Sequence, residues 1–273
     1  MTHKQILNKK TVRLSLFCLF LFYVPSISAS SSPEHFYEKY DFDQHLIHVL
    51  KIRPKAYHIQ LAKTSQEKSE SLPMLAKRFK AQIAINGGFF QKSRSGQPFP
   101  AGTLIIAGKI YRISNQIQSL LVIESGKINI LRANPKQNFK ISKKISILSG
   151  LPLLLSKSQI PIELKEKTSS FFTQAHARTA IGIKSDQTIV LVVAEDNHFY
   201  PLQAFLKQKE RVDGLSMIEL AEFMKNLGCE SALNLDGGSS SALWLKNKII
   251  NEATVEKLSD LSDGIIFTKR DLK

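Results

Sequence analysis

Several short segments of this sequence combine a charged or amide side chain with glycine or serine, and the clearest one contains Asp236. A buried strand is followed by Asp236, Gly237 and Gly238 and then by three serines, of which Ser240 is the second. An acidic residue at a strand end, next to glycines and hydroxyl groups, can hold a carboxylate beside hydrogen-bond donors for a polar ligand. A tight Asp-Gly turn is the alternative explanation.

A second segment joins the end of a strand to two glycines. Asn86 is followed by Gly87 and Gly88. Glycine tolerates positive φ and lets the backbone approach a ligand closely, and consecutive exposed amides can bind an anion as a nest. A plain hairpin turn would use the same residues, because Asn-Gly is a common turn dipeptide.

A third segment places His176, Arg178 and Thr179 at the start of a strand. The planar fork of an arginine suits phosphate or carboxylate, and His176 points to the same side as Arg178 in an extended chain. Glu195 and Asp196 end the next strand, and hairpin geometry brings that end near Arg178. Such a carboxylate beside an arginine is either a catalytic group or a salt bridge.

Paired carboxylates among Glu195, Asp196 and Asp236 favour acid–base chemistry. Two carboxyl groups can supply an acid and a nucleophile or base, as glycosidic bond cleavage needs. The sequence lacks GxGxxG, Gly-Lys-Ser/Thr, HExxH, CxxC and GxSxG, so we expect no cofactor and no metal site. Cys229 follows a helix stop, which predicts a core cysteine with no lowered pKa.

Short strands must position these segments, because most of the chain is typical of closely spaced strand pairs. Hairpins are predicted at 103–113, 119–132 and 178–194, further strands at 45–52, 81–86 and 232–235, and a short helix at 72–80. Strand pairs at this density with isolated helices predict an α+β fold. We expect a single domain with a mixed, largely antiparallel sheet flanked by a few helices.

The clearest helix is predicted over 217–227. Ser216 can cap it, Glu219 can complete a capping box, and Gly228 supplies the stop. The chain then enters the strand that delivers Asp236. Helix, strand, acidic residue and glycine turn form one unit, which we interpret as the edge of an active site.

The N-terminal residues have the pattern of a secretory signal. A basic leader precedes an apolar run over 14–24, and small residues lead to Ala29. That run is shorter than the roughly 20 residues that span a bilayer. We therefore expect a signal peptide over 1–29, a polar N-terminal segment over 30–44 and one domain over 45–273. The mature chain, with no transmembrane segment, is expected to be periplasmic or secreted after cleavage near Ala29.

Composition limits the function classes further. With 43% hydrophobic residues among 273 the chain is too apolar for a disordered protein, and two cysteines exclude a disulfide scaffold. The formal net charge of +15 favours anionic partners such as phosphorylated glycans, anionic lipid surfaces or nucleic acid. Because the lysines are scattered without interleaved aromatic residues, we favour a solvated basic surface and expect no specific nucleic-acid partner.

Taken in order, several segments resemble the phosphodiester glycosidase family. The matching segments are AINGGFF (84–90), SGLPLLL (149–155), ARTAIGI (177–183), GLSMIELAEFMKNLGCESALNLDGGSSSAL (214–243) and SDGIIF (262–267). The resemblance implies an α+β fold with a mixed sheet and an exported hydrolase that releases a sugar from a phosphodiester. Bacterial members of this family are often tied to exopolysaccharide or envelope metabolism, which suggests a cell-envelope or extracellular glycan as substrate.

The resemblance and the residue chemistry together give a candidate site. The expected catalytic residues are Asp236, Glu195 and Arg178, and the expected substrate-binding residues are Asn86, Gly87, Gly88, His176, Thr179, Gly237, Gly238 and Ser240. Arg178, aided by the amides of Gly87 and Gly88, would hold the phosphate. Asp236 would face the sugar as nucleophile, base or oxocarbenium stabiliser, with Glu195 second.

The chain departs from its relatives at two places within this site. Many relatives have Asp-Gly-Arg where this chain has Glu195-Asp196-Asn197, and a third glycine where it has Ser239. Two other functions stay open: a phosphodiesterase that cuts the O–P bond, and a non-catalytic protein that binds anionic envelope glycans.

Overall fold

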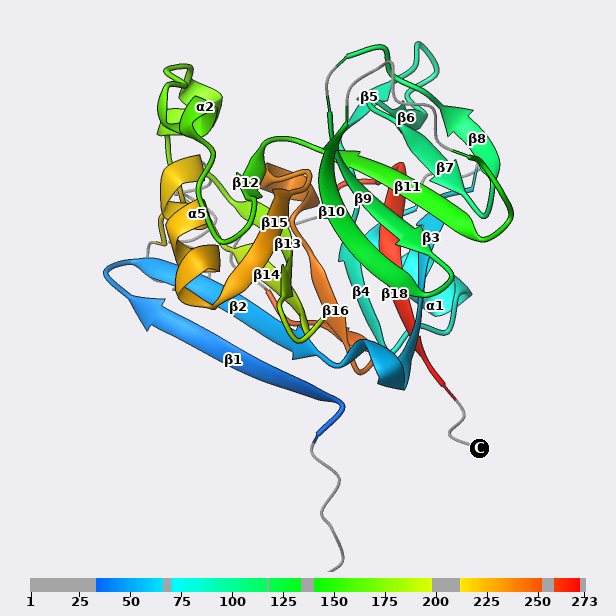
Figure 1. The fold of residues 1–273 in the computed structure, drawn as a ribbon, viewed down its shortest axis with the longest axis horizontal. Helices are drawn as coiled ribbons and strands as arrows, with labels where there is room; N and C mark the ends of the chain where they lie inside the picture. Colours follow the sequence, from blue (N-terminus) through cyan, green and yellow to red (C-terminus); the bar gives the residue numbers. More distant parts are fainter. Residues whose placement is uncertain are drawn as a thin grey trace, which may run out of the picture. The chain divides into compact units, whose positions relative to one another are not determined.

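The computed structural model describes residues 33–65, 70–116, 118–133, 140–197, 212–251 and 258–270. Its named strands form three larger sheets and one two-stranded sheet, and every pairing between them is antiparallel (Figure 1). The α+β class is supported, but the prediction of a single mixed sheet is wrong. Many neighbouring strands are joined by short turns, and such turns connect antiparallel strands only.

The first sheet carries most of the predicted site. Its order is β1 (His35–Phe42), β2 (His45–Ile52), β14 (Ile189–Ala194), β13 (Arg178–Lys184), β15 (Cys229–Asn234) and β12 (Leu153–Leu155). The predicted strand at 45–52 and the hairpin at 178–194 are confirmed. Strand β1 lies within the segment that the sequence assigned to a polar N-terminus over 30–44. The chain is ordered there because β1 pairs with β2 along its whole length.

The second and third sheets have five strands each, and both pack against the first sheet. The second runs β10 (Lys127–Ala133), β9 (Gln118–Glu124), β11 (Ile145–Gly150), β7 (Leu104–Ile106) and β8 (Lys109–Arg112). The third runs β17 (Lys248–Ile249), β16 (Leu243–Leu245), β4 (Ile83–Asn86), β18 (Asp263–Lys269) and β3 (Tyr57–Lys63), and the small sheet pairs β5 (Phe90–Lys92) with β6 (Pro98–Pro100). The predicted hairpins at 103–113 and 119–132 are confirmed.

Among the described residues, helix α5 (Met217–Asn226) packs against the first sheet and helix α1 (Leu72–Arg78) against the third. The other described helices are α2 (Ile162–Lys165) and α3 (Ser170–Thr173), with 3-10 turns η1 (Pro54–Ala56) and η2 (Gly238–Ser240). The capping box of Ser216 and Glu219 at the start of α5 is confirmed. Over the described part of the chain, no helix has both the length and the apolar character needed to cross a membrane.

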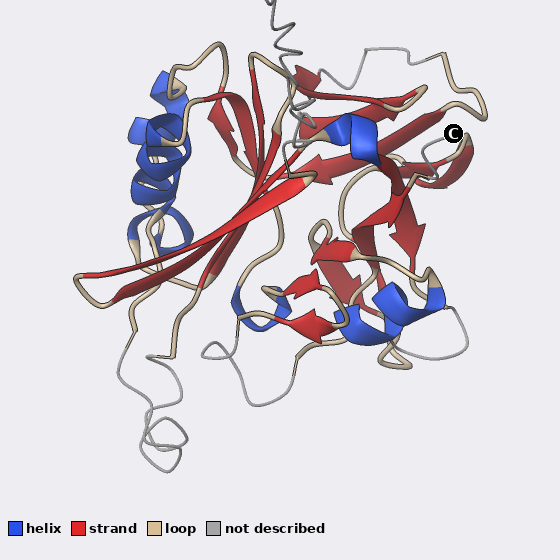
Figure 2. Ribbon diagram, turned by 90° about the horizontal axis from the view of Figure 1, so that it is seen from below, coloured by secondary structure: helices blue, strands red, loops and turns tan. Residues whose placement is uncertain are grey.

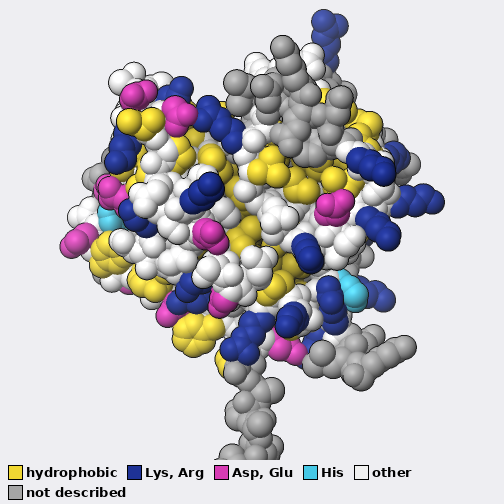
Figure 3. All heavy atoms as spheres, in the orientation of Figure 1, with side chains coloured by type: hydrophobic (Ala, Val, Ile, Leu, Met, Phe, Trp, Pro, Cys, Tyr) yellow, Lys and Arg dark blue, Asp and Glu magenta, His cyan; other side chains and the backbone are white. Residues whose placement is uncertain are grey.

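The elements pack in layers around two main cores (Figure 2). One core lies between the first sheet and the other two, and includes Leu50, Ile181, Leu233 and Ile265. The opposite face of the first sheet packs against α5 through residues such as Leu220. Lys and Arg side chains are spread over the face drawn in Figure 3, with acidic and apolar side chains between them. The expected signal peptide over 1–29 lies outside the described residues.

Candidate active site

Antiparallel pairing gathers the predicted site residues at one end of the sheets. In the first sheet Arg178 pairs with Ala194, so Arg178 at the start of β13 lies level with the end of β14. Ala180 pairs with Asn234, so the end of β15 and Asp236 reach the same edge. In the third sheet Gly264 pairs with Asn86, which places the start of β18 beside the end of β4.

Asn86 ties the two sheets together. The side chain is fully buried, and its Nδ2 donates to the carbonyl of Asp236 at 2.8 Å. Its Oδ1 accepts from the Thr179 hydroxyl at 2.9 Å and from the amide of Ala242 at 3.1 Å. Because these bonds join β4, β13 and the turn after β15, Asn86 and Thr179 position the turn that carries Asp236.

The backbone amides of Gly87 and Gly88 donate hydrogen bonds to Asp263, so they are not available to a ligand. The Gly87 amide donates to the Asp263 carbonyl at 3.1 Å, and the Gly88 amide donates to Asp263 Oδ1 at 2.8 Å. The expected anion nest of these two amides is therefore not formed. Glycine is required for close approach, since a Cβ on Gly87 would lie 1.9 Å from Asp263 Oδ1.

Asp236 follows β15 and keeps part of its surface exposed. Its carboxylate accepts from the Gly237 amide at 3.0 Å and from the Ser240 hydroxyl. Burial raises the pKa of Asp236 to about 6, and the nearby charge of Asp263 adds to the rise. Asp236 is therefore a carboxyl that solvent can reach and that changes charge near neutral pH.

Asp263 is a second buried carboxyl of this site, and the sequence analysis did not select it. It is 2% exposed, and its Oδ2 accepts from the Ser262 hydroxyl. Burial raises its pKa to about 6, while the bonds from Ser262 and Gly88 and the charge of Lys63 oppose that rise. The signal was the Ser-Asp-Gly run before an apolar strand, which repeats the acidic-glycine pattern of Asp236.

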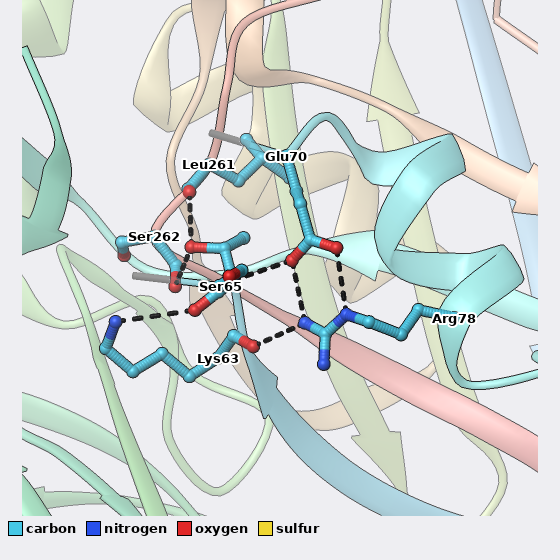
Figure 4. A network of polar contacts seen from close by, with 7 residues as sticks. Lys63, Ser65, Glu70, Arg78, Leu261 and Ser262 are labelled. Atoms are coloured by element: carbon cyan, nitrogen blue, oxygen red, sulfur yellow. Dashed lines mark hydrogen bonds and ion pairs between the residues drawn. The ribbon is translucent and has the colours of Figure 1, made fainter. Parts of the chain in front are cut away.

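A polar network holds the segment that leads into Asp263 (Figure 4). The Thr64 hydroxyl donates to the carbonyls of Leu261 and Ser262 at 2.9 and 3.0 Å. Beside it, the buried Glu70 accepts two bonds from Arg78, at 2.8 and 2.7 Å. These hydrogen bonds hold residues 261 and 262, which directly precede β18.

Arg178 lies on the helix-covered face of the first sheet. It is 2% exposed, and its Nε donates to the Leu215 carbonyl at 2.8 Å. Its Nη2 donates to the carbonyls of Phe171 and Gln174 at 2.8 and 3.0 Å. Burial lowers its pKa to about 10, and the charge of Asp196 opposes that shift. All three of these hydrogen bonds therefore go to backbone carbonyls, and Nη1 makes no hydrogen bond to the described residues.

Glu195 lies on the opposite face of the same sheet. Side chains alternate along a strand, and Glu195 has the orientation of Val193, which faces the core between the sheets. It is 1% exposed and hydrogen-bonded to His48 Nε2, while His48 Nδ1 is bonded to the Tyr37 hydroxyl. Of the two carboxylates expected near Arg178, Asp196 is therefore the one whose charge acts on it, and Glu195 faces the other side of the sheet.

The remaining predicted residues are neighbours of Arg178 or of Asp236. His176 is half-buried near Arg178 and Asp196, and desolvation followed by the Arg178 charge lowers its pKa. Gly237 and Gly238 form the turn after Asp236, where Gly238 has a φ of 59° and is exposed. Among the described residues, no three His, Cys, Asp or Glu side chains gather closely enough to hold a metal ion.

Comparisons with known proteins agree with this fold. A family model described as phosphodiester glycosidase matches residues 79–268. The catalytic domain of zebrafish N-acetylglucosamine-1-phosphodiester alpha-N-acetylglucosaminidase superposes with a TM-score of 0.66 at 21% identity, covering 88% of this chain and 85% of that one. A candidate exported protein of Burkholderia pseudomallei gives 0.67 at 14% identity, covering 82% and 74%. At these identities the likeness shows the fold alone.

Two relatives are similar in sequence. An uncharacterized Rickettsia conorii protein is 31% identical over 121 residues, which is 43% of this chain and 38% of that protein. An uncharacterized SPbeta prophage-derived protein of Bacillus subtilis is 23% identical over 202 residues, or 72% of this chain and 28% of its own length. The chain thus spans about a third of the length of these relatives.

Proposed function

The chain belongs to the phosphodiester glycosidase family, and we propose that it hydrolyses the glycosidic bond of a sugar-1-phosphodiester. Water adds at the anomeric carbon while the bond from that carbon to the phosphate oxygen breaks. The products are a free sugar and a phosphomonoester, which keeps the electron pair of the broken bond. Because a phosphomonoester is a good leaving group, the reaction needs little help from a general acid.

The carboxyl of Asp236 carries this proposal. It stands at a strand end with part of its surface exposed, and its pKa is raised to about 6, so it is ionised for most of the time at neutral pH. An ionised carboxylate can attack the anomeric carbon, accept a proton from water or stabilise the positive charge that develops on the sugar ring. We assign Asp236 one of these roles.

Other residues of the site support Asp236. Asp263 is too buried to touch a substrate, and it acts as a positioning residue whose charge raises the pKa of Asp236. Arg178 is equally buried and anchors the backbone before the site through its bonds to three carbonyls. In this proposal its positive charge attracts the phosphate without direct contact. Glu195, bonded to His48 in the core between the sheets, is the weaker candidate for a second catalytic carboxylate.

The proposed setting is outside the cytoplasm. A basic and then apolar leader with small residues up to Ala29 supports export, and the basic composition suits a phosphorylated glycan of the envelope or the surroundings. The domain proposed for 45–273 extends toward the N-terminus by strand β1.

Product analysis tests the proposal. Purified protein is incubated with a panel of sugar-1-phosphodiesters in ¹⁸O-labelled water. Glycosidic cleavage yields free sugar that carries the label at its anomeric hydroxyl and an unlabelled phosphomonoester. Label in phosphate would instead identify cleavage of the O–P bond, and binding without products would identify a glycan-binding protein; either result contradicts the proposal.

A further inference from the structure

A cavity of about 230 Å³ lies between helix α2, strand β12 and strand β10 (Figure 1). Most of its wall is apolar and comes from Leu151, Pro152, Leu153, Pro161, Leu164 and Phe172. The proposed function assigns no role to these residues. An apolar cavity beside a site for a polar reaction suits a substrate that is polar at one end and apolar at the other.

Backbone hydrogen bonds attach the wall of this cavity to the strand that carries Asp236. The Leu151 amide donates to the Asn234 carbonyl at 3.0 Å, and the Asn234 amide donates to the Pro152 carbonyl at 3.1 Å. The side chain of Asn234 adds a bond from Nδ2 to the Leu151 carbonyl at 2.6 Å. Asn234 precedes Asp236 by two residues, which is about 7 Å of extended chain. The wall is therefore held close to the proposed catalytic carboxyl.

A row of three aromatic rings leads from the Asp236 site to the same cavity. Phe89 follows the turn at 87–88, which accepts a hydrogen bond from the Asp236 amide at 3.1 Å. The centre of the Phe89 ring lies 6.0 Å from that of Phe171, which lies 4.9 Å from that of Phe172 in the cavity wall. All three side chains are partly exposed. The row therefore offers a continuous apolar path between the two places.

Exposed apolar side chains lie at this cavity. Leu151, in its wall, is 49% exposed. Ile162, between the wall residues Pro161 and Glu163, is 68% exposed. A group of exposed apolar side chains around an apolar cavity marks a binding site, because a ligand that covers them gains hydrophobic free energy.

The charged residues of the wall already have partners or reach water. Arg132 and Glu163 are each about half-exposed and form an ion pair at 2.7 Å. Lys167 is exposed, and its Nζ lies 5.8 Å from the centre of the Phe172 ring. Pairing and hydration satisfy these charges, so the surface left for a ligand is mainly apolar.

We infer that this cavity binds the leaving group of the substrate, and that the leaving group is the phosphate ester of an aliphatic alcohol. The inference rests on the proposed function, because it names the chemical class of the part beyond the phosphate. The phosphate, one oxygen away from the anomeric carbon, stays beside Asp236, and only the carbon chain enters the cavity. Hydrolysis then releases a free sugar and an alkyl phosphate.

Calorimetric titration with ethyl, butyl and hexyl phosphate tests the inference without turnover, since these probes share one phosphate group and differ only in their carbon chains. We expect affinity to rise about twofold for each added methylene, less than the roughly fourfold gain of complete burial, because the cavity is partly open. Glucose 6-phosphate, with a polar group in place of the chain, should bind no more tightly than ethyl phosphate.

Two matched variants locate the binding of the chain. Leu151→Gln keeps the size of the side chain but removes apolar surface from the wall, so the preference for hexyl over ethyl phosphate should fall about threefold or more. Ile110→Gln removes an aliphatic side chain that is 50% exposed on β8, at the opposite edge of the second sheet from β10. That variant should keep the full preference.

The outcomes separate this inference from the proposed function. A chain-length preference that falls in Leu151→Gln and persists in Ile110→Gln supports the cavity assignment. Equal affinities for ethyl and hexyl phosphate, absent binding, tighter binding of glucose 6-phosphate, or an equal preference in the two variants overturns it, even where the sugar-phosphodiester panel is hydrolysed. A failure to hydrolyse any member of that panel contradicts the proposed function and does not alter the reading of the titrations.

Discussion

Asp236 and Asp263 are joined through one residue, Gly87. The amide of Asp236 donates to the Gly87 carbonyl at 3.1 Å, and the amide of Gly87 donates to the Asp263 carbonyl at 3.1 Å. The two acids come from different sheets, on the segments that follow β15 and begin β18. Their relative position is therefore held by backbone bonds, which do not depend on the charge of either side chain.

Replacing the carboxylate of Asp236 should abolish most activity without unfolding the protein. We expect Asp236→Asn to lower kcat/KM for a sugar-1-phosphodiester by about 100-fold or more, as is typical when a catalytic carboxyl group is lost. Asp186→Asn, in the turn between β13 and β14, removes the same charge far from the site. Near wild-type turnover by Asp236→Asn would exclude Asp236 as the catalytic carboxylate.

The pH profile should report the coupling between the two acids. If ionised Asp236 is the active form, kcat/KM rises with pH through about 6, the pKa of Asp236. The negative charge of Asp263 contributes to that pKa, so Asp263→Asn should move the rising limb to lower pH. A limb that stays in place, measured over pH 4.5–8, would show that Asp263 does not act on Asp236.

Burial of Asp263 should make stability depend on pH. Its folded pKa of about 6 lies above the ordinary 3.8, so the folded state binds more protons between these values. The stabilising contribution is complete below about pH 4 and is lost as the pH rises through about 6. Urea unfolding from pH 4 to 7 should show the free energy of unfolding fall relative to Asp263→Asn, by roughly 2–3 kcal/mol. If the free energy of unfolding changed with pH in the same way in the wild type and in Asp263→Asn, the raised pKa of Asp263 would be contradicted.

A methyl group on Gly87 should disrupt the junction of the two acids. The added Cβ would lie 1.9 Å from Asp263 Oδ1 and 2.9 Å from the Asp263 carbonyl oxygen, so backbone must move. We expect Gly87→Ala to lower both stability and kcat. Gly96→Ala serves as the control because no atom lies within 4 Å of its Cβ, and its φ of 80° alone should cost about 1 kcal/mol. Thermal melts and kcat measured together distinguish the two variants.

Loss of Arg178 should destabilise the fold as well as the reaction. Its guanidinium donates to three backbone carbonyls, of which Leu215 also accepts from the His176 amide. Arg178→Ala therefore removes the donor of the Phe171 and Gln174 carbonyls and should lower the free energy of unfolding by about 2 kcal/mol or more. Arg132→Ala breaks an exposed ion pair and should cost less than about 1 kcal/mol. Equal urea midpoints for these variants would show that the bonds of Arg178 contribute little to stability.

Local sequence patterns were enough to predict several hairpins and the clearest helix. The hairpins at 103–113, 119–132 and 178–194 and the capped helix at 217–227 are marked by turn residues, alternation and a capping box, which act over a few residues. The strand ends that carry Asn86 and Asp236 were found in the same way. Such signals need no knowledge of distant contacts.

Tertiary structure alone decided what these residues face. Arg178 and Glu195 lie near each other along the hairpin but on opposite faces of the sheet, since side chains alternate along a strand. The alternation can be predicted from the sequence, but which layer covers each face is known only from the folded chain. The amides of Gly87 and Gly88 meet Asp263, which the chain brings back from its C-terminal strand. Pairing between distant strands depends on the packing of whole sheets, so Asp263 and its raised pKa could be assigned only from the folded chain.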